Sequence, residues 1–168
     1  MDLNTKQEIL EVLTMPEETF WSQVAPAARE VCQKQFGTSL LVTAMLAYTN
    51  ICKNQCLYCG MRAGNKIPRY RMSPEEILPL AQRAREDGLG RMFLLAGEDQ
   101  NYGFEKLLTL IAGLRQQGYT IALGAGELSR TQYQELHDAG VEEYVLKFEM
   151  SHPDSFQRLN PSTTYAKR

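Results

Sequence analysis

The sequence predicts an α/β fold made of parallel βα repeats, and three observations support this prediction. Short apolar runs, typical of buried strands, alternate with segments of helical period along residues 40–159. Serine or proline stands at three of the four helix starts, and glycine follows three of the four helices. Polar residues follow each apolar run. Strands and helices that alternate in this way form βα units whose strands lie parallel in one sheet.

The first segment, residues 4–36, is outside this repeat and predicts two helices. A T-x-x-E sequence at Thr14 is typical of the capping box that begins a helix, here the second. Cys32 falls at the end of the apolar face of that helix, where we expect a small buried side chain rather than a fourth metal ligand. We therefore assign residues 1–38 to a helical N-terminal extension and residues 39–168 to the repeat domain.

Four strands are expected, each followed by a helix. The strands are predicted at Leu40–Tyr48, Met92–Leu95, Thr120–Leu123 and Tyr144–Phe148. The helices are predicted between Ser73 and Gly88, between Phe104 and Gly118, from Ser129 to Ala139 and from Pro153 to Leu159. Periodicity alone leaves open whether the strands curve into a barrel or form an open sheet.

Three cysteines lie in the loop after the first expected strand. Cys52, Cys56 and Cys59 have the spacing C-x3-C-x2-C. Three thiolates can ligate three irons of a [4Fe–4S] cluster, and an open fourth position distinguishes a reactive metal centre from a structural one. Zinc is an alternative, although zinc sites usually combine two ligand pairs and this sequence has one C-x2-C pair. A disulfide pattern is disfavoured because the sequence shows no secretory signal.

Polar residues also follow the other expected strands. Glu98 follows the second strand and Gly124 the third, while Lys147 and Glu149 close the fourth. Parallel α/β folds place their sites at the carboxyl ends of the strands. Each residue has a simpler interpretation as well. Glu98 with Asp99 could cap the next helix, and Gly124 could serve only a turn.

The composition excludes several function classes. The 168 residues carry 18 basic and 20 acidic side chains, a net charge of −2, which lacks the basic excess of a nucleic-acid-binding surface. The longest apolar run, Leu40–Tyr48, is far shorter than the roughly 20 residues that span a bilayer. Residues 1–10 lack the apolar core of a signal peptide. We therefore expect a cytoplasmic protein with neither a nucleic-acid nor a membrane partner.

Residues 48–60 (YTNICKNQCLYCG) resemble the cluster loop of the radical S-adenosylmethionine superfamily, in which Tyr58 fills the aromatic position of C-x3-C-x-aromatic-C. Residues 69–77 (RYRMSPEEI) and the G-E-D at residues 97–99 are similar to the branch that contains biotin synthase, methylornithine synthase and the [FeFe]-hydrogenase maturase HydE, with HydE-like sequences matching best. The resemblance implies the N-terminal half of a TIM-type (β/α)8 barrel. A full barrel takes about 200 residues or more, so we expect a truncated chain of about four βα units.

The resemblance also implies roles for individual residues. Cys52, Cys56 and Cys59 would ligate the [4Fe–4S] cluster, whose open iron binds the amino and carboxylate groups of S-adenosylmethionine. Implied contacts to this cofactor come from Tyr58 beside the adenine, Gly97 and Glu98 at the methionine ammonium, Glu149, and Arg168. Gly124 takes a position near the substrate, where HydE-like proteins often carry serine.

The implied activity is the reductive cleavage of S-adenosylmethionine to methionine and a 5′-deoxyadenosyl radical, which abstracts hydrogen from a small-molecule substrate. Implied partners are a reductant such as ferredoxin or flavodoxin and, for a HydE-like protein, other hydrogenase maturation proteins. An enzyme like methylornithine synthase or biotin synthase is the alternative. From another class, a non-catalytic iron–sulfur or zinc module, or an inactive fragment, also stays open.

Overall fold

The structure is a computed structural model that describes residues 3–168. The chain divides into two compact units between Leu41 and Val42. The domain boundary expected after residue 38 stays a prediction. Within the described residues, no helix is both long enough and apolar enough to cross a membrane.

The first unit consists of short helices in succession. They are α1 (Lys6–Thr14), α2 (Glu17–Thr19), the π-helical η1 (Phe20–Val24) and α3 (Ala25–Phe36). The capping box predicted at Thr14 is wrong, because Thr14 is the last residue of α1 and its hydroxyl donates to the Leu10 carbonyl at 2.7 Å. Pro16 holds Met15 in an extended conformation, which ends α1. The capping box lies at the other end of α1, between Thr5 and Glu8.

Cys32 on α3 is exposed, so the prediction that it is a buried small side chain is wrong. None of the described residues 3–41 is buried. A group of helices this small encloses too little volume to bury a side chain completely.

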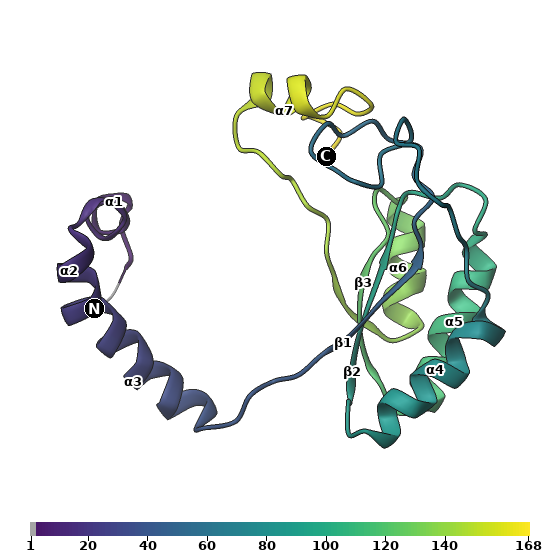
Figure 1. Cartoon of the computed structure of the whole chain (residues 1–168), viewed down its shortest axis with the longest axis horizontal. Helices are drawn as coiled ribbons and strands as arrows, with labels where there is room; N and C mark the ends of the chain where they lie inside the picture. Colours follow the sequence, from purple (N-terminus) through teal and green to yellow (C-terminus); the bar gives the residue numbers. More distant parts are fainter. Residues whose placement is uncertain (1–2) are drawn as a thin grey trace. The chain divides into compact units, whose positions relative to one another are not determined.

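The second unit contains a parallel sheet with strands in the order β1-β2-β3-β4. Its strands are β1 (Ala44–Thr49), β2 (Arg91–Ala96), β3 (Thr120–Gly124) and β4 (Val141–Tyr144). The helices between and after them are α4 (Pro74–Glu86), α5 (Phe104–Gln116), α6 (Arg130–Asp138) and α7 (Pro153–Leu159). This architecture confirms the predicted βα repeat (Figure 1).

The first and last strands differ from their predicted bounds. β1 begins at Ala44, and the preceding Leu40, Leu41 and Val42 are exposed, because apolar residues alone do not supply a strand partner. β4 ends at Tyr144, which pairs with Leu123, so only the first residue of the predicted fourth strand lies in β4. Glu149 therefore lies beyond the sheet, in the left-handed region with φ +63°.

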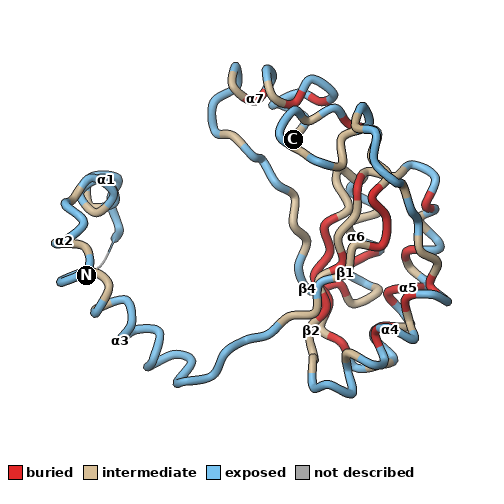
Figure 2. Tube along the Cα trace, in the orientation of Figure 1, coloured by how far each residue is buried: buried red, intermediate tan, exposed pale blue. Residues whose placement is uncertain are grey.

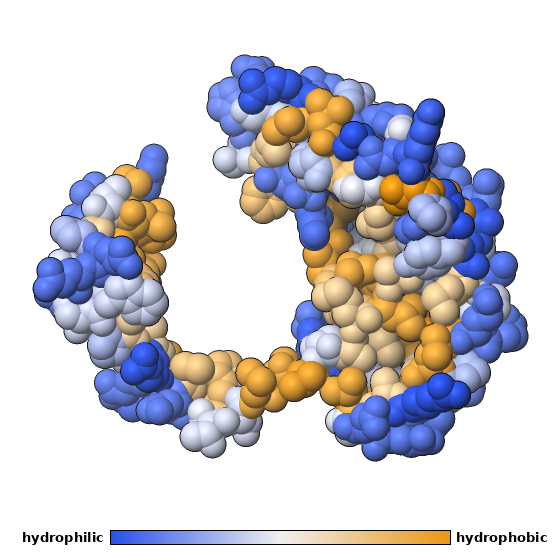
Figure 3. All heavy atoms as spheres, in the orientation of Figure 1, coloured by the Kyte–Doolittle hydropathy of each residue, from blue (hydrophilic) through white to orange (hydrophobic). Residues whose placement is uncertain are grey.

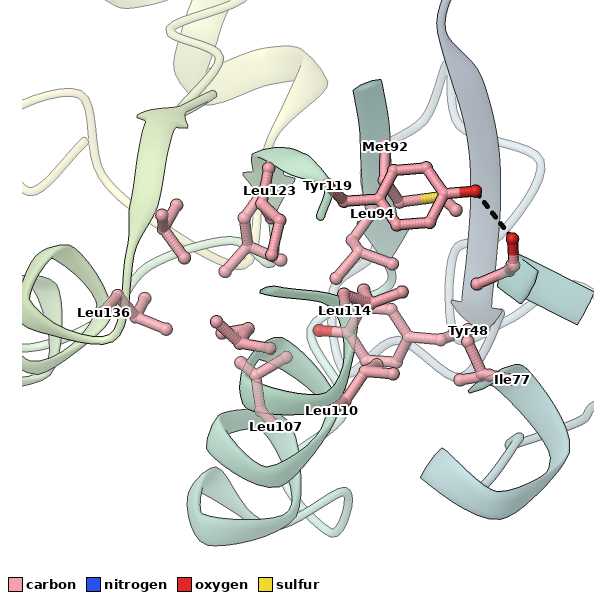
Figure 4. Packing of buried hydrophobic residues seen from close by; sticks show 14 of the residues in the cluster. Tyr48, Ile77, Met92, Leu94, Leu107, Leu110, Leu114, Tyr119, Leu123 and Leu136 are labelled. Atoms are coloured by element: carbon pink, nitrogen blue, oxygen red, sulfur yellow. Dashed lines mark hydrogen bonds between the residues drawn. The ribbon is translucent and has the colours of Figure 1, made fainter. Parts of the chain in front are cut away.

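The core lies between the sheet and the helices on one of its faces (Figure 2). Alternate residues of β2 and β3 point toward those helices and are buried, among them Met92, Leu94 and Ile121. At the edge of this core the Tyr119 hydroxyl donates to the Ala81 carbonyl at 2.7 Å, which ties the start of β3 to α4 (Figure 4).

The other face of the sheet has no helix over it within residues 42–168, and Met45 is 68% exposed there. Apolar side chains gather on the surface over the strands (Figure 3). One covered face and one open, apolar face are the features of half a βα barrel, whose complete form fills its interior with side chains from all its strands.

Candidate functional site

The strands β1, β2 and β3 end at one edge of the sheet, and the candidate site is built from the residues that follow them. The cysteine loop (residues 50–71) lies at this edge together with α7 and the C-terminal segment (residues 160–168) (Figure 1). The Leu57 amide donates to the carbonyl of Leu159, the last residue of α7, at 2.9 Å. The structure thus brings residues about 100 positions apart in sequence into one site.

The three cysteines of the loop lie near one another and are half-buried. Burial raises the pKa of the Cys56 thiol, and the neighbouring thiols of Cys52 and Cys59 raise it further, while Tyr58 and Arg168 act in the opposite direction. Among residues 3–168 no three His, Cys, Asp or Glu side chains converge on a single ion. A [4Fe–4S] cube takes each thiolate at its own iron, so three thiolates of one loop can hold it without converging on a single atom.

Arg69 fixes the shape of the cysteine loop from within. Its NH1 group donates to the carbonyls of Asn50 at 2.6 Å and Met61 at 2.8 Å. Its NH2 group donates to the carbonyls of Arg62 at 2.7 Å and Asn65 at 3.0 Å. A planar guanidinium can serve several carbonyls at once because its donors lie in a fixed fork. Arg69 therefore packs inside the cysteine loop and ties its two ends together.

The C-terminal segment holds the loop from outside. The Gln55 amide donates to the Ser162 hydroxyl at 2.7 Å, and the Tyr58 hydroxyl donates to the Asn160 side-chain oxygen at 2.5 Å. Burial raises the pKa of Tyr58, as do the nearby charges of Cys56 and Glu149. Tyr58 is consequently a neutral hydrogen-bond donor beside the thiols.

Gly97 lies where the cysteine loop crosses the end of β2. A Cβ atom on Gly97 would be 2.2 Å from the Ile51 carbonyl oxygen and 2.8 Å from the Cys52 Cβ. The Gly97 amide also donates to the Thr49 carbonyl at 3.0 Å. This close approach of two backbones requires glycine.

Replacing Gly97 by alanine is expected to lower the free energy of unfolding by about 2 kcal/mol, because the added methyl group meets backbone atoms that must move. Urea denaturation measures this change. Gly60→Ala in the same loop is the matched control, since a Cβ there has no atom within 4 Å. Equal stability of the two variants would contradict the close approach.

Glu98 is a half-buried carboxylate at the same edge, with 10% of its side chain exposed. Its oxygens lie 3.2 Å from Lys53 Nζ and 3.6 Å from Arg168 NH2. Gly126, with φ +82°, leaves the space that the Glu98 side chain occupies. The interpretation of Glu98 and Asp99 as a helix cap is wrong, because Gly103 is the N-cap residue of α5.

Asp99 instead fastens the end of the cysteine loop to the sheet. Its two oxygens accept from Arg71 Nε and NH2, both at 2.7 Å, and one also accepts from the Thr49 hydroxyl at 2.9 Å. The hydrogen bond from Arg71 lowers the pKa of Asp99 most strongly. Asp99 is thus an ionised residue that supports the loop.

Glu127, at the end of β3, is a second half-buried carboxylate that our sequence reasoning missed. It accepts from the Thr163 hydroxyl at 2.8 Å and lies 2.8 Å from Lys167 Nζ and 3.1 Å from Arg168 Nε. Burial alone would raise the pKa of Glu127, but the contacts with Lys167, Thr163 and Arg168 lower it. Its place after the third strand, equivalent to that of Glu98 after the second, was the available signal.

The remaining predicted residues lie at the margin of this group. Gly124 is the last residue of β3, and a Cβ there would be 3.3 Å from Leu95 Cδ2, so a small side chain would fit with little movement. Glu149 is exposed beyond β4, close enough for its charge to act on Tyr58. Phe148 and Arg168, with Ser151 and Tyr165, line a hollow of about 380 Å³.

A loop with three cysteines at the carboxyl ends of parallel strands places the chain among the α/β proteins whose candidate site is built on cysteines. A family model described as the radical SAM superfamily matches residues 46–168, and the chain belongs to this superfamily. Its members are enzymes that use a [4Fe–4S] cluster and S-adenosylmethionine.

Individual relatives place the chain near one branch of the superfamily. The [FeFe] hydrogenase maturase subunit HydE of Thermotoga maritima is 31% identical, over 98% of this chain and 47% of the relative. Biotin synthase of Nitrosopumilus maritimus is 28% identical, over 98% of this chain and 52% of the relative. The crystal structure of methylornithine synthase (PylB) matches 97% of this chain and 49% of its own length with a TM-score of 0.87 and 22% identity, which shows the same fold.

The chain spans about half the length of the curated relatives it matches. The recognition of the superfamily from the cysteine loop and the prediction of half a barrel are both confirmed.

Proposed function

We propose that these residues form the part of a radical SAM enzyme that binds the cluster and the cofactor. The observation that carries this proposal is a three-cysteine loop fixed by Arg69 from within and by the C-terminal segment from outside. A metal site whose ligands are held in place by a surrounding shell of hydrogen bonds is preorganised for binding.

In this proposal Cys52, Cys56 and Cys59 hold the cluster through their thiolates. When bound there, the cluster would supply the electron for the reductive cleavage of S-adenosylmethionine to methionine and a 5′-deoxyadenosyl radical. Such a reaction depends on the orientation of the reacting groups and on the exclusion of water. The contact of the cysteine loop with α7 and the C-terminal segment covers the loop on the side of these two segments.

Two charged side chains at the carboxyl ends of the strands, Glu98 and Arg168, match the ammonium and carboxylate groups of an amino acid. Glu98 receives the ammonium group of the methionine part, where Lys53 Nζ now lies at 3.2 Å. Arg168 provides a guanidinium for a carboxylate, and Gly97 lets the backbone approach closely. Tyr58 and Glu149 lie on the side of the thiols where we place the adenosine, and Gly124 borders the substrate space.

We further propose a HydE-like role in the maturation of the [FeFe]-hydrogenase H-cluster, supported by 31% identity over 98% of this chain. This role implies a small-molecule substrate, a reductant such as ferredoxin or flavodoxin, and contact with other maturation proteins in the cytoplasm. A methylornithine-synthase-like activity is the second candidate, supported by 24% identity to a 3-methylornithine synthase over 94% of this chain.

The test is anaerobic reconstitution with iron and sulfide, followed by reduction and low-temperature EPR with and without S-adenosylmethionine. We expect the signal of a reduced [4Fe–4S] cluster that changes when the cofactor is added. Adenosine, which lacks the amino and carboxylate groups, is the control and is expected to change nothing. A cluster that forms but ignores the cofactor would contradict the proposed cofactor site, and failure to form a cluster would contradict the proposal as a whole.

A further inference from the structure

Arg168 lies between two largely buried carboxylates, Glu98 and Glu127, which follow β2 and β3. Its Nε atom is 3.1 Å from Glu127, and its NH2 atom is 3.6 Å from Glu98. The side chains of all three residues are 10% exposed. Charges this far removed from water need a partner, because an unpaired buried charge is strongly destabilising.

The two carboxylates differ in how firmly they are held. Glu127 is fixed by the Thr163 hydroxyl at 2.8 Å and by Lys167 at 2.8 Å, in addition to Arg168. Glu98 lies 3.2 Å from Lys53 and 3.6 Å from Arg168, and both distances are longer than those of Glu127 to Lys167 and Arg168, 2.8 Å and 3.1 Å. Glu98 can therefore exchange its partners more readily than Glu127 can.

We infer that Glu127 is a positioning residue, the permanent counter-ion that holds Arg168 when Glu98 turns to the ammonium group of the cofactor. This inference rests on the proposed function. Without Glu127, Glu98 is the remaining carboxylate beside Arg168, so the guanidinium competes with the ammonium for the same oxygens. With Glu127 in place, Arg168 keeps a partner and stays directed toward the cofactor carboxylate.

The same contacts give Glu127 an indirect hold on the cysteine loop. Thr163, which donates to Glu127, follows Ser162, whose hydroxyl accepts from the Gln55 amide. The C-terminal segment therefore bridges the end of β3 and the loop. A loss of Glu127 leaves the bonds from the loop to residues 159–162 intact, so the cluster is expected to form without it.

The experiment compares Glu127→Gln, Arg168→Gln and the double variant with the wild-type protein after anaerobic reconstitution. Glu135→Gln, at an exposed position on α6, is the matched control. Iron content reports the cluster, and titration of the EPR signal with S-adenosylmethionine gives the dissociation constant. We expect Glu127→Gln to keep its iron and to raise the dissociation constant about tenfold, as for one lost charged contact in a half-buried site.

The double variant distinguishes a role through Arg168 from a separate one. We expect it to bind no more weakly than Arg168→Gln alone, because Glu127 acts through that guanidinium. Thr163→Val, which keeps the Glu127 charge but removes the hydroxyl that aims it, is expected to weaken binding less than Glu127→Gln does.

Three results would overturn the inference: unchanged affinity in Glu127→Gln, additive losses in the double variant, or loss of the cluster in Glu127→Gln, which would make Glu127 a structural residue. If the wild-type protein itself forms a cluster that ignores the cofactor, the proposed function fails first, and the two failures are thereby distinguished.

Discussion

Replacing Cys52, Cys56 or Cys59 by serine is expected to abolish the [4Fe–4S] cluster, which makes this the largest effect of any substitution considered. In the proposed site each thiolate would hold its own iron, and the three come from one loop, so no spare ligand would take over. The measurement is iron and acid-labile sulfide per chain after anaerobic reconstitution, together with the visible absorbance of the cluster. We expect less than about a tenth of the wild-type iron in each variant.

The control for this series is Cys32→Ser. Cys32 is exposed on α3, in the first of the two units, and we expect its variant to keep the full cluster. Loss of metal in Cys32→Ser would instead support a closed site with four thiolates, which is the non-catalytic alternative. Zinc in place of iron in the purified protein, retained during reconstitution, would support that alternative as well.

The sequence was sufficient for those features that depend on residues close together in the chain. The alternation of apolar runs and helical segments predicts the order of strands and helices from β1 to α7, and the helix predicted to begin at Ser129 has Ser129 as its N-cap. The three cysteines predict an iron–sulfur loop because the ligands of one site are supplied by eight consecutive residues.

Features that depend on pairing between distant segments could not be predicted in this way. The bounds of β4 follow from its pairing with β3, and within this strand Glu142 pairs with Arg115 and Glu143 with Arg91. Glu127 was missed because its partners lie some 40 residues away in the C-terminal segment. Local hydrophobic patterns contain no information about such partners.

The arginine inside the cysteine loop provides the second large expected effect. We expect Arg69→Gln to lower the free energy of unfolding by about 3 kcal/mol or more, because a hydrogen bond to a charged group contributes about 1.5–3 kcal/mol and Arg69 donates four, whose contributions are not additive. The carbonyls that lose this donor are partly buried, so water replaces it incompletely. Urea denaturation of the metal-free protein measures the change.

Two comparisons separate the geometry of Arg69 from its charge. Arg69→Lys keeps the charge but replaces the planar fork with one ammonium group, which cannot reach carbonyls on both sides of the loop, so we expect it to restore less than half of the lost stability. Arg83→Gln, at an exposed position on α4, removes a charge without touching the loop and is expected to change stability by less than about 0.5 kcal/mol. Since the carbonyls bound by Arg69 lie on both sides of Cys52, Cys56 and Cys59, Arg69→Gln is also expected to lose its cluster faster than the wild-type protein when a chelator is added. A variant as stable as Arg83→Gln, with an equally long-lived cluster, would show that the cysteine loop keeps its shape without Arg69.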